Sequence, residues 1–139
     1  MHKDMKIVLV DDEEINLILL EELTSSIGFK DIIMFLDPLS ALSHLEKNHC
    51  DILVLDYNMP KMDGLTLLKK AKEIDSTMIS IMITASNEES VMIDALKIGV
   101  TDFLTKPISS IAYTLRLQNM AKIQNSHRLT KEFNNILQK

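Results

Sequence analysis

The feature that most constrains this chain is a set of short, almost wholly apolar runs, each followed at once by polar side chains. The runs and the residues that follow them are 7–10 with Asp11 and Asp12, 52–55 with Asp56, and 78–83 with Thr84. Because these runs are continuous rather than alternating, they predict strands buried on both faces, as in a parallel sheet covered by helices. Weaker strands are expected at 32–35 and at 101–104, the second leading to Lys106.

Amphipathic stretches separate the runs, with apolar residues at helical spacing. Pro38 and Pro107 suit first turns of helices, and Gly28 and Gly99 suit helix ends. The expected helical faces are Ile15, Leu19, Leu20, Leu23 and Ile27; Leu39, Leu42 and Leu45; Leu65, Leu68 and Ala71; Val91, Ala95 and Ile98; and Ile108, Ile111, Ala112 and Leu115. Five strand–helix units imply right-handed crossovers and an α/β fold with a doubly wound parallel sheet.

Composition excludes several classes of protein. The 139 residues suffice for one domain, and 46% hydrophobic with 25% charged residues is typical of a globular protein. A net charge of −5 argues against nucleic-acid binding. We expect no membrane segment, because no apolar run reaches about 18 residues. No secretory signal is recognised at the N-terminus and the chain has one cysteine, Cys50, so a cytoplasmic location is expected.

The polar residues that follow the strands should meet at one edge of the sheet, where open α/β sheets bind ligands. Asp11, Asp12 and Asp56 would repel one another there unless one were protonated or a cation held them. Oxygen ligands without nearby Cys or His favour Mg²⁺ over zinc. A carboxylate can also attack phosphorus and form an acyl phosphate, which Lys106 and the Thr84 hydroxyl could stabilise.

Each of these residues has a simpler interpretation when it is taken alone. Asp11 and Asp12 could be acids in the first turn of a helix, and Asp56 could be a turn residue. Thr84 could be a helix cap, and Lys106 could be a solvated surface lysine. The functional interpretation therefore depends on all five occurring together.

The sequence resembles the CheY-like receiver domain of two-component response regulators over about residues 5–123. The stretches that carry the resemblance are 8–13, 55–64, 83–85 and 99–107, and in this order and spacing they are highly specific. The resemblance implies a flavodoxin-like (βα)5 three-layer sandwich, with a parallel five-stranded sheet of order 2-1-3-4-5.

By position, the resemblance implies that Asp56 accepts a phosphoryl group from a sensor histidine kinase or phosphotransfer protein. It also implies a Mg²⁺ site made by Asp11, Asp12, Asp56 and the backbone carbonyl of Asn58, in which Asp11 would hold either the metal itself or a metal-bound water. Asn58 and Ser86 would flank the path of the water that removes the phosphoryl group.

Three further residues would form the switch in such a domain. Thr84 would move toward the phosphoryl group, Phe103 would turn inward behind it, and Lys106 would pair with its oxygens. The Lys106–Pro107 bond is expected to be cis. This chain departs from the family at Phe103, where many members have Tyr, so an outward hydrogen bond from that ring is not available.

The resemblance implies a switch rather than an enzyme, with phosphorylation changing the surface of the fourth helix, fifth strand and fifth helix to control an output. Phosphorylation from small donors and self-catalysed dephosphorylation are compatible with this role. The alternative is an α/β phosphatase or phosphotransferase with Asp56 as nucleophile, but such enzymes generally carry a second Asp where this chain has Asn58. An interaction module with an inactive site is disfavoured by the intact Asp56, Thr84 and Lys106.

Residues 124–139 are interpreted as a helical extension or linker toward a C-terminal output domain or effector, with a frayed tail as the alternative. Leu129, Phe133, Ile136 and Leu137 recur at helical spacing, and an isolated helix would need a partner for them. Homodimers could form through this segment, or through the fourth helix, fifth strand and fifth helix. Asp102 and Arg116 match positions that some dimerising receivers pair across subunits.

Overall fold

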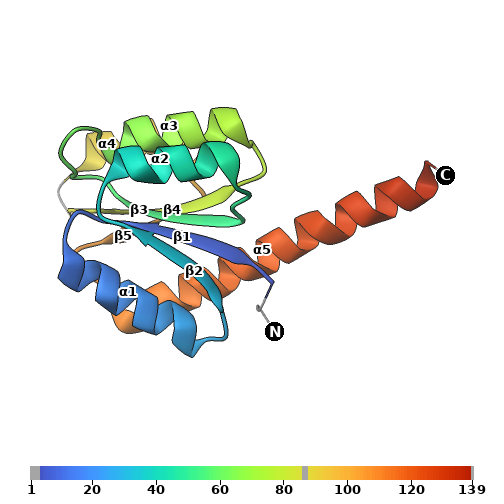
Figure 1. The fold of residues 1–139 in the computed structure, drawn as a ribbon, viewed down its shortest axis with the longest axis horizontal. Coiled ribbons are helices and arrows are strands. Elements are labelled where there is room, and N and C mark those ends of the chain that lie inside the picture. The colour runs from blue at the N-terminus through green and yellow to red at the C-terminus, as the bar shows by residue number, and fades with distance from the viewer. Residues whose placement is uncertain (1–3, 86–87, 139) are drawn as a thin grey trace.

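The computed structural model describes residues 4–85 and 88–138, which form alternating strands and helices (Figure 1). In chain order these are β1 Lys6–Val10, α1 Glu14–Ser26, β2 Asp31–Phe35, α2 Pro38–Lys47, β3 Ile52–Asp56, α3 Gly64–Ile74, β4 Ile79–Thr84, α4 Glu89–Ile98, β5 Asp102–Thr105 and α5 Ser110–Leu137. The strands pair in parallel in the order β2-β1-β3-β4-β5. The predicted fold class and strand order are confirmed.

Helices cover both faces of the sheet, with α1 and α5 on one face and α2, α3 and α4 on the other (Figure 1). Successive residues of β1 alternate between the two layers. Ile7 and Leu9 pack with α1 and α5, whereas Val8 and Val10 pack with α2, α3 and α4. This two-sided burial explains why the strands are continuously apolar in the sequence.

Three of the predicted helical faces are wrong in part, those of α1, α2 and α5, and on α2 the side chain of Leu39 is 44% exposed. Ile15 is 81% exposed, because α1 turns Leu17, Leu20 and Thr24 toward the sheet. On α5, Ile111 and Leu115, which their spacing placed on the apolar face, are 73% and 56% exposed.

The fifth helix begins later than predicted. It begins at Ser110, after a cis Lys106–Pro107 bond, and the Ser109 side chain accepts a hydrogen bond from the Ala112 N–H. The residues that it buries are Tyr113, Leu117, Met120, Ala121 and Gln124. This stripe, rather than the predicted one, packs against the sheet because it is longer. In addition, the Tyr113 hydroxyl makes a hydrogen bond of 2.7 Å with the buried Thr24 hydroxyl.

Helix α5 is a single helix of 28 residues, and its last part protrudes well beyond the sheet (Figure 1). Leu129, Phe133, Ile136 and Leu137 are each at least 60% exposed on this protruding part. No helix within residues 4–85 and 88–138 combines the length and apolar character needed to cross a membrane.

Candidate functional site

The register of the parallel strands brings the predicted polar residues together. Val10 pairs with Leu55, Asp56 with Ile83, and Thr84 with Thr105. The strands therefore end almost level, and the residues at or just past their ends share one edge. These residues are Asp11 and Asp12 after β1, Asp56 at the end of β3, Thr84 at the end of β4 and Lys106 after β5.

Three acids meet at this edge. Carboxylate oxygens of Asp11, Asp12 and Asp56 lie within 4.8 Å of one another. Asp11 and Asp56 are buried, whereas Asp12 is exposed and marks the side open to solvent. Within the described residues, Asp11 Oδ2 and both carboxylate oxygens of Asp56 are buried without a hydrogen-bond partner, apart from the ion pair between Asp56 Oδ1 and Lys106. Buried carboxylate oxygens without donors are suited to a hard divalent cation.

The acids are costly to ionise without such a cation. Burial, supported by the nearby charge of Asp56, raises the pKa of Asp11 to about 6, although the Glu13 N–H donates to its Oδ1 at 2.9 Å. Burial also raises the pKa of Asp56, against the opposing effect of Lys106. A positive charge placed among these groups would relieve both effects.

Lys106 supplies one fixed positive charge. Its ammonium nitrogen lies 3.0 Å from Asp56 Oδ1, and its backbone N–H donates to the Thr84 carbonyl at 2.9 Å. Burial opposes the charge on Lys106, but the hydrogen bond and charge of Asp56 outweigh it, so its pKa is raised. The lysine is therefore cationic and is held against one oxygen of Asp56.

The Thr84 hydroxyl does not donate its hydrogen bond to Asp56. Its hydroxyl donates to Glu88 Oε2 at 3.0 Å, and the Asn58 side-chain amide donates to Glu88 Oε1 at 3.4 Å. Sequence reasoning missed Glu88. No local sequence pattern marks Glu88 as a partner of the Thr84 hydroxyl.

Gly64 is a second residue that shapes this edge. Its N–H donates to the Tyr57 carbonyl at 2.9 Å, which places the first turn of α3 against the end of β3. A Cβ at this position would lie 2.5 Å from the Asp56 carbonyl oxygen and 2.8 Å from the Tyr57 Cα. Only glycine therefore lets α3 begin so close to the backbone of Asp56.

Phe103 lies on β5. Its ring is partly buried against the core layer of α2, α3 and α4, and it lines a surface cavity of about 400 Å³ between α4, β5 and α5. Asp102 and Arg116 form an ion pair within the chain at this cavity, with Arg116 Nε 3.4 Å from Asp102 Oδ2. Ser86 lies outside the described residues.

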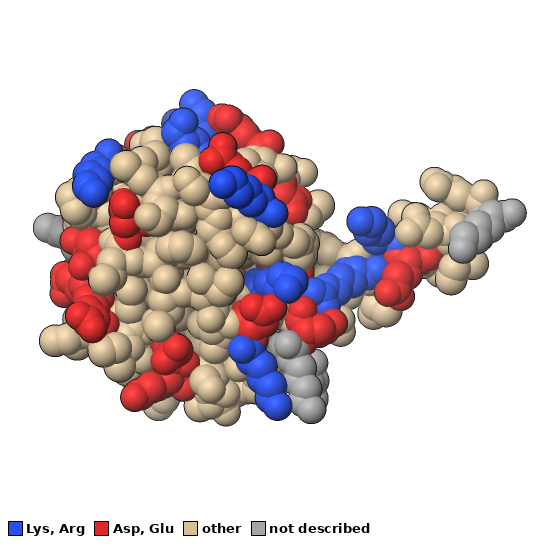
Figure 2. Space-filling model, in the orientation of Figure 1, with Lys and Arg blue, Asp and Glu red and all other residues tan. Residues whose placement is uncertain are grey.

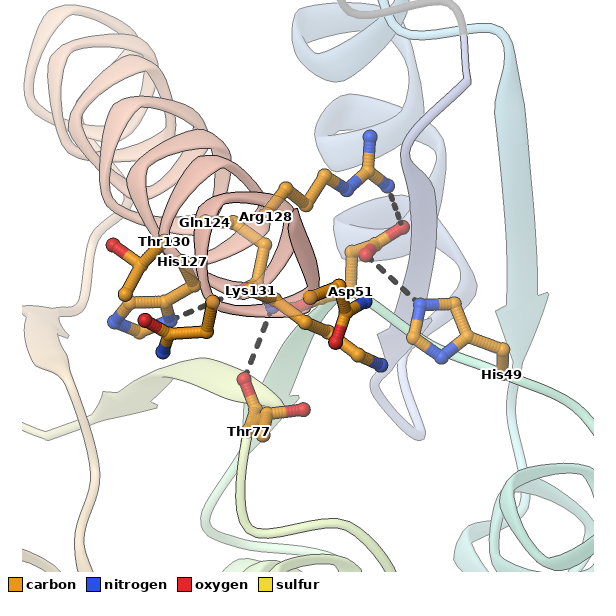
Figure 3. Close-up of a pocket in the computed structure, with 10 residues that line it drawn as sticks. His49, Asp51, Thr77, Gln124, His127, Arg128, Thr130 and Lys131 are labelled. Atoms are coloured by element: carbon orange, nitrogen blue, oxygen red, sulfur yellow. Dashed lines mark hydrogen bonds and ion pairs between the residues drawn. The ribbon is translucent and has the colours of Figure 1, made fainter. Parts of the chain in front are cut away.

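A further polar cluster lies at the opposite, amino end of the strands (Figure 3). The buried carboxylate of Asp51 accepts hydrogen bonds from the Lys6 N–H at 2.8 Å and His49 at 2.9 Å, and pairs with Arg128 at 2.9 Å. Gln124 donates to the carbonyls of Asp51 and Thr77, at 2.6 and 3.1 Å. We call Asp51, Gln124 and Arg128 the α5 clasp.

The α5 clasp holds one turn of α5 against the starts of β1, β3 and β4, beside a cavity of about 720 Å³. Sequence reasoning missed it, because isolated polar residues on a helix normally indicate a solvated face. The only available signal was Gln124, which continues the buried stripe of α5.

Acidic side chains predominate on the side where β1 leads into α1, away from the protruding part of α5 (Figures 1 and 2). Asp12, Glu13 and Glu14 are exposed there. This side of the molecule would repel a nucleic-acid backbone and attract cations.

Comparisons with known proteins agree with this geometry. The family model for the response regulator receiver domain matches residues 7–118. Chemotaxis protein CheY of Bacillus subtilis is 30% identical over 105 residues, which cover 76% of this chain and 88% of that protein. The cyclic di-GMP phosphodiesterase response regulator RpfG of Xanthomonas campestris is 34% identical over 131 residues, which cover 92% of this chain and 35% of RpfG.

Solved structures show the same fold. The signal receiver domain of an HD domain-containing protein from Pseudomonas fluorescens superposes with a TM-score of 0.83 at 26% identity, covering 92% of this chain and 95% of that one. The chain therefore spans most of some relatives and about a third of RpfG.

Proposed function

Because the chain belongs to the response regulator receiver domain family, we propose that it is a phosphorylation switch that carries its phosphoryl group on Asp56. The observation that supports the assignment is a difference between the two oxygens of the Asp56 carboxylate. Oδ1 of Asp56 pairs with Lys106, whereas Oδ2 is also buried and has no partner in the described part of the chain, and carboxylate oxygens of Asp11 and Asp12 lie within 4.8 Å of the Asp56 carboxylate.

In the proposed reaction, Oδ2 of Asp56 attacks the phosphorus of a phosphohistidine or small acyl phosphate. An oxygen–phosphorus bond forms as the bond to the donor's nitrogen or oxygen breaks, and the electron pair leaves with the donor. Lys106 stabilises charge on the transferring oxygens, and Thr84 can supply a hydrogen bond once its hydroxyl is released.

Mg²⁺ is the proposed cofactor, held by Asp11, Asp12, Asp56 and the backbone carbonyl of Asn58. When bound, it would neutralise the acids and the incoming phosphoryl oxygens. The acidic cluster and its unpartnered buried oxygens support this assignment.

A switch is a better proposal than an enzyme that turns over small substrates. Receiver domains generally act as signalling switches, and the position two residues after Asp56 holds Asn58 rather than a second acid. Asn58 cannot act as a general acid, so the phosphatase alternative is not favoured. Slow phosphorylation by small donors and slow self-catalysed dephosphorylation are part of the proposal.

We propose a sensor histidine kinase or phosphotransfer protein as the phosphoryl donor, in the cytoplasm. Residues 5–123 form the proposed receiver domain, and 124–139 extend it toward an output domain or effector. Relatives in which the matching region is a minor part of the protein, such as RpfG, support an attached output. The exposed Leu129, Phe133, Ile136 and Leu137 support homodimerisation through α5, as an alternative to the α4–β5–α5 surface.

Intact-mass analysis after incubation with acetyl phosphate and Mg²⁺ tests the proposal. The wild-type chain should gain the mass of one phosphoryl group, and Asp56→Asn should gain none. Asp94→Asn removes an exposed carboxylate from α4 and should label like the wild type. Equal labelling of Asp56→Asn and wild type, or continuous turnover of a phosphomonoester, would contradict the proposal.

A further inference from the structure

The side chain of Glu88 joins the site to the start of α4. It accepts hydrogen bonds from the Thr84 hydroxyl through Oε2, at 3.0 Å, and from the Asn58 amide through Oε1, at 3.4 Å. We propose that Glu88 is a latch, a positioning residue that holds Thr84 in the unphosphorylated state and is displaced when Asp56 carries a phosphoryl group. This inference rests on the proposed phosphorylation of Asp56.

The latch works by competition for one proton. A threonine hydroxyl has a single donor, so Thr84 cannot donate to Glu88 and to a phosphoryl oxygen at the same time. Thr84 is fully buried, which leaves it few other partners, and a hydrogen bond to a carboxylate is among the stronger kinds. Phosphorylation must therefore break the Thr84–Glu88 bond before Thr84 can stabilise the phosphoryl group.

The charge on Glu88 works in the same direction. Phosphorylation turns the Asp56 carboxylate, with a charge of −1, into an acyl phosphate with about −2, and it extends this charge toward a Glu88 carboxylate that already contacts Thr84 and Asn58. Like charges at short range disfavour each other. Glu88 is therefore expected to leave this position when the phosphoryl group arrives.

Displacement of Glu88 changes the first turn of α4. Glu88 immediately precedes α4, its carbonyl accepts the Met92 N–H at 3.2 Å, and its side chain does not cap the helix. Moving it disturbs the turn that orients α4. That helix exposes Ile93 and Leu96, at 48% and 61%, so the surface available to a partner changes.

The latch gives this chain a way to transmit phosphorylation that does not depend on Phe103. A phenylalanine ring has no hydroxyl whose hydrogen bond could change with its position. Glu88, in contrast, accepts two hydrogen bonds from residues of the site, Thr84 and Asn58. The Thr84–Glu88 contact therefore couples the site directly to α4.

Beryllium fluoride with Mg²⁺, which mimics an aspartyl phosphate, is the probe for the first experiment. Glu88→Ala should bind it about tenfold more tightly than wild type, the factor expected for one lost competing bond. Glu89→Ala removes the neighbouring exposed carboxylate and should bind it as the wild type does. Equal affinity of Glu88→Ala and wild type would overturn the latch, whereas a wild-type chain that binds no beryllium fluoride would overturn the proposed function.

A double-mutant cycle separates the latch from simple charge repulsion. In a Thr84→Val background the hydroxyl is gone, so Glu88→Ala should lose most of its effect on beryllium fluoride affinity. Additive effects of the two substitutions would mean that Glu88 acts through its charge alone and would overturn the latch.

Amide hydrogen exchange gives a readout that does not depend on affinity. Beryllium fluoride should speed exchange in the first turn of α4 in the wild type, and Glu88→Ala should show that faster exchange without the probe. Slow exchange in unliganded Glu88→Ala, as in unliganded wild type, would contradict the link to α4.

Discussion

The ammonium group of Lys106 lies 3.0 Å from Oδ1 of Asp56, while Oδ2 of the same carboxylate has no hydrogen-bond partner among the described residues. One oxygen is thus committed to a fixed cation, and the other is available to a metal ion or to phosphorus. Lys106 comes one residue after β5 and Asp56 ends β3, so the contact depends on the whole parallel sheet.

Replacing Lys106 by Ala should slow labelling by acetyl phosphate at least about tenfold, because a positioned cation for the transferring oxygens is lost. Mg²⁺ affinity should be retained, since Lys106 is not a metal ligand. The rate is measured by intact mass over time. Lys97→Ala, an exposed lysine in the last turn of α4, is the control, and wild-type labelling by Lys106→Ala would disprove its role.

Replacing Asp12 by Asn should weaken Mg²⁺ binding by on the order of tenfold, or about 1.4 kcal/mol, because one charged oxygen ligand becomes neutral. Titration calorimetry measures the affinity. Asp94→Asn makes the same change on the exposed surface of α4, outside the acidic cluster, and should not alter binding. An unchanged affinity in Asp12→Asn would remove Asp12 from the metal site.

The α5 clasp predicts a pH dependence of stability. Burial alone would raise the pKa of Asp51, but hydrogen bonds from Lys6, His49 and Arg128 outweigh it and hold the pKa below its ordinary 3.8. A carboxyl whose pKa is lower in the folded state than in the unfolded state stabilises the fold fully at pH values above its unfolded-state pKa. This stabilisation is lost as the pH falls through its folded-state pKa.

Asp51→Asn should therefore lower the free energy of unfolding by about 1–3 kcal/mol near neutral pH. The difference from wild type should shrink once the pH falls below 3.8. Urea unfolding near neutral pH and below pH 3.8 measures this difference in the free energy of unfolding, and Asp94→Asn, at an exposed carboxylate, is the control. A difference that is independent of pH would show that the charge of Asp51 contributes nothing.

Gly64→Ala should lower the free energy of unfolding by about 1–3 kcal/mol and slow phosphorylation, because the new Cβ would force the Asp56 backbone to move. Gly28→Ala is the matched control. It has a φ of 106° but no neighbouring atom within 4 Å, so it should destabilise the chain without affecting labelling. Equal labelling rates for both variants would contradict the role of Gly64.

The sheet and its acidic edge were predictable because they depend on local patterns. Continuous apolarity identified β1, β3 and β4, and burial on both faces explains why that signal was strong. The polar residues after each strand then had to share an edge, since parallel strands place their carboxyl ends together.

The parts that sequence reasoning missed depend on tertiary contacts. Ile15 and Ile111 fit an apolar spacing, yet the competing stripes through Leu17 and Tyr113 pack instead. Asp51 and Gln124 are polar residues whose partners lie far along the chain, and the Thr84–Glu88 contact joins the end of β4 to the residue before α4. No local pattern encodes such pairings.

Locating the phosphoryl group on the chain tests directly whether Asp56 is the phosphoryl acceptor. After incubation with acetyl phosphate and Mg²⁺, borohydride reduction of the acyl phosphate and tandem mass spectrometry identify the modified residue. We predict modification at Asp56 alone, and no modification when Mg²⁺ is chelated. Modification at Asp11 or Asp12, or an unmodified chain in the presence of Mg²⁺, would contradict it.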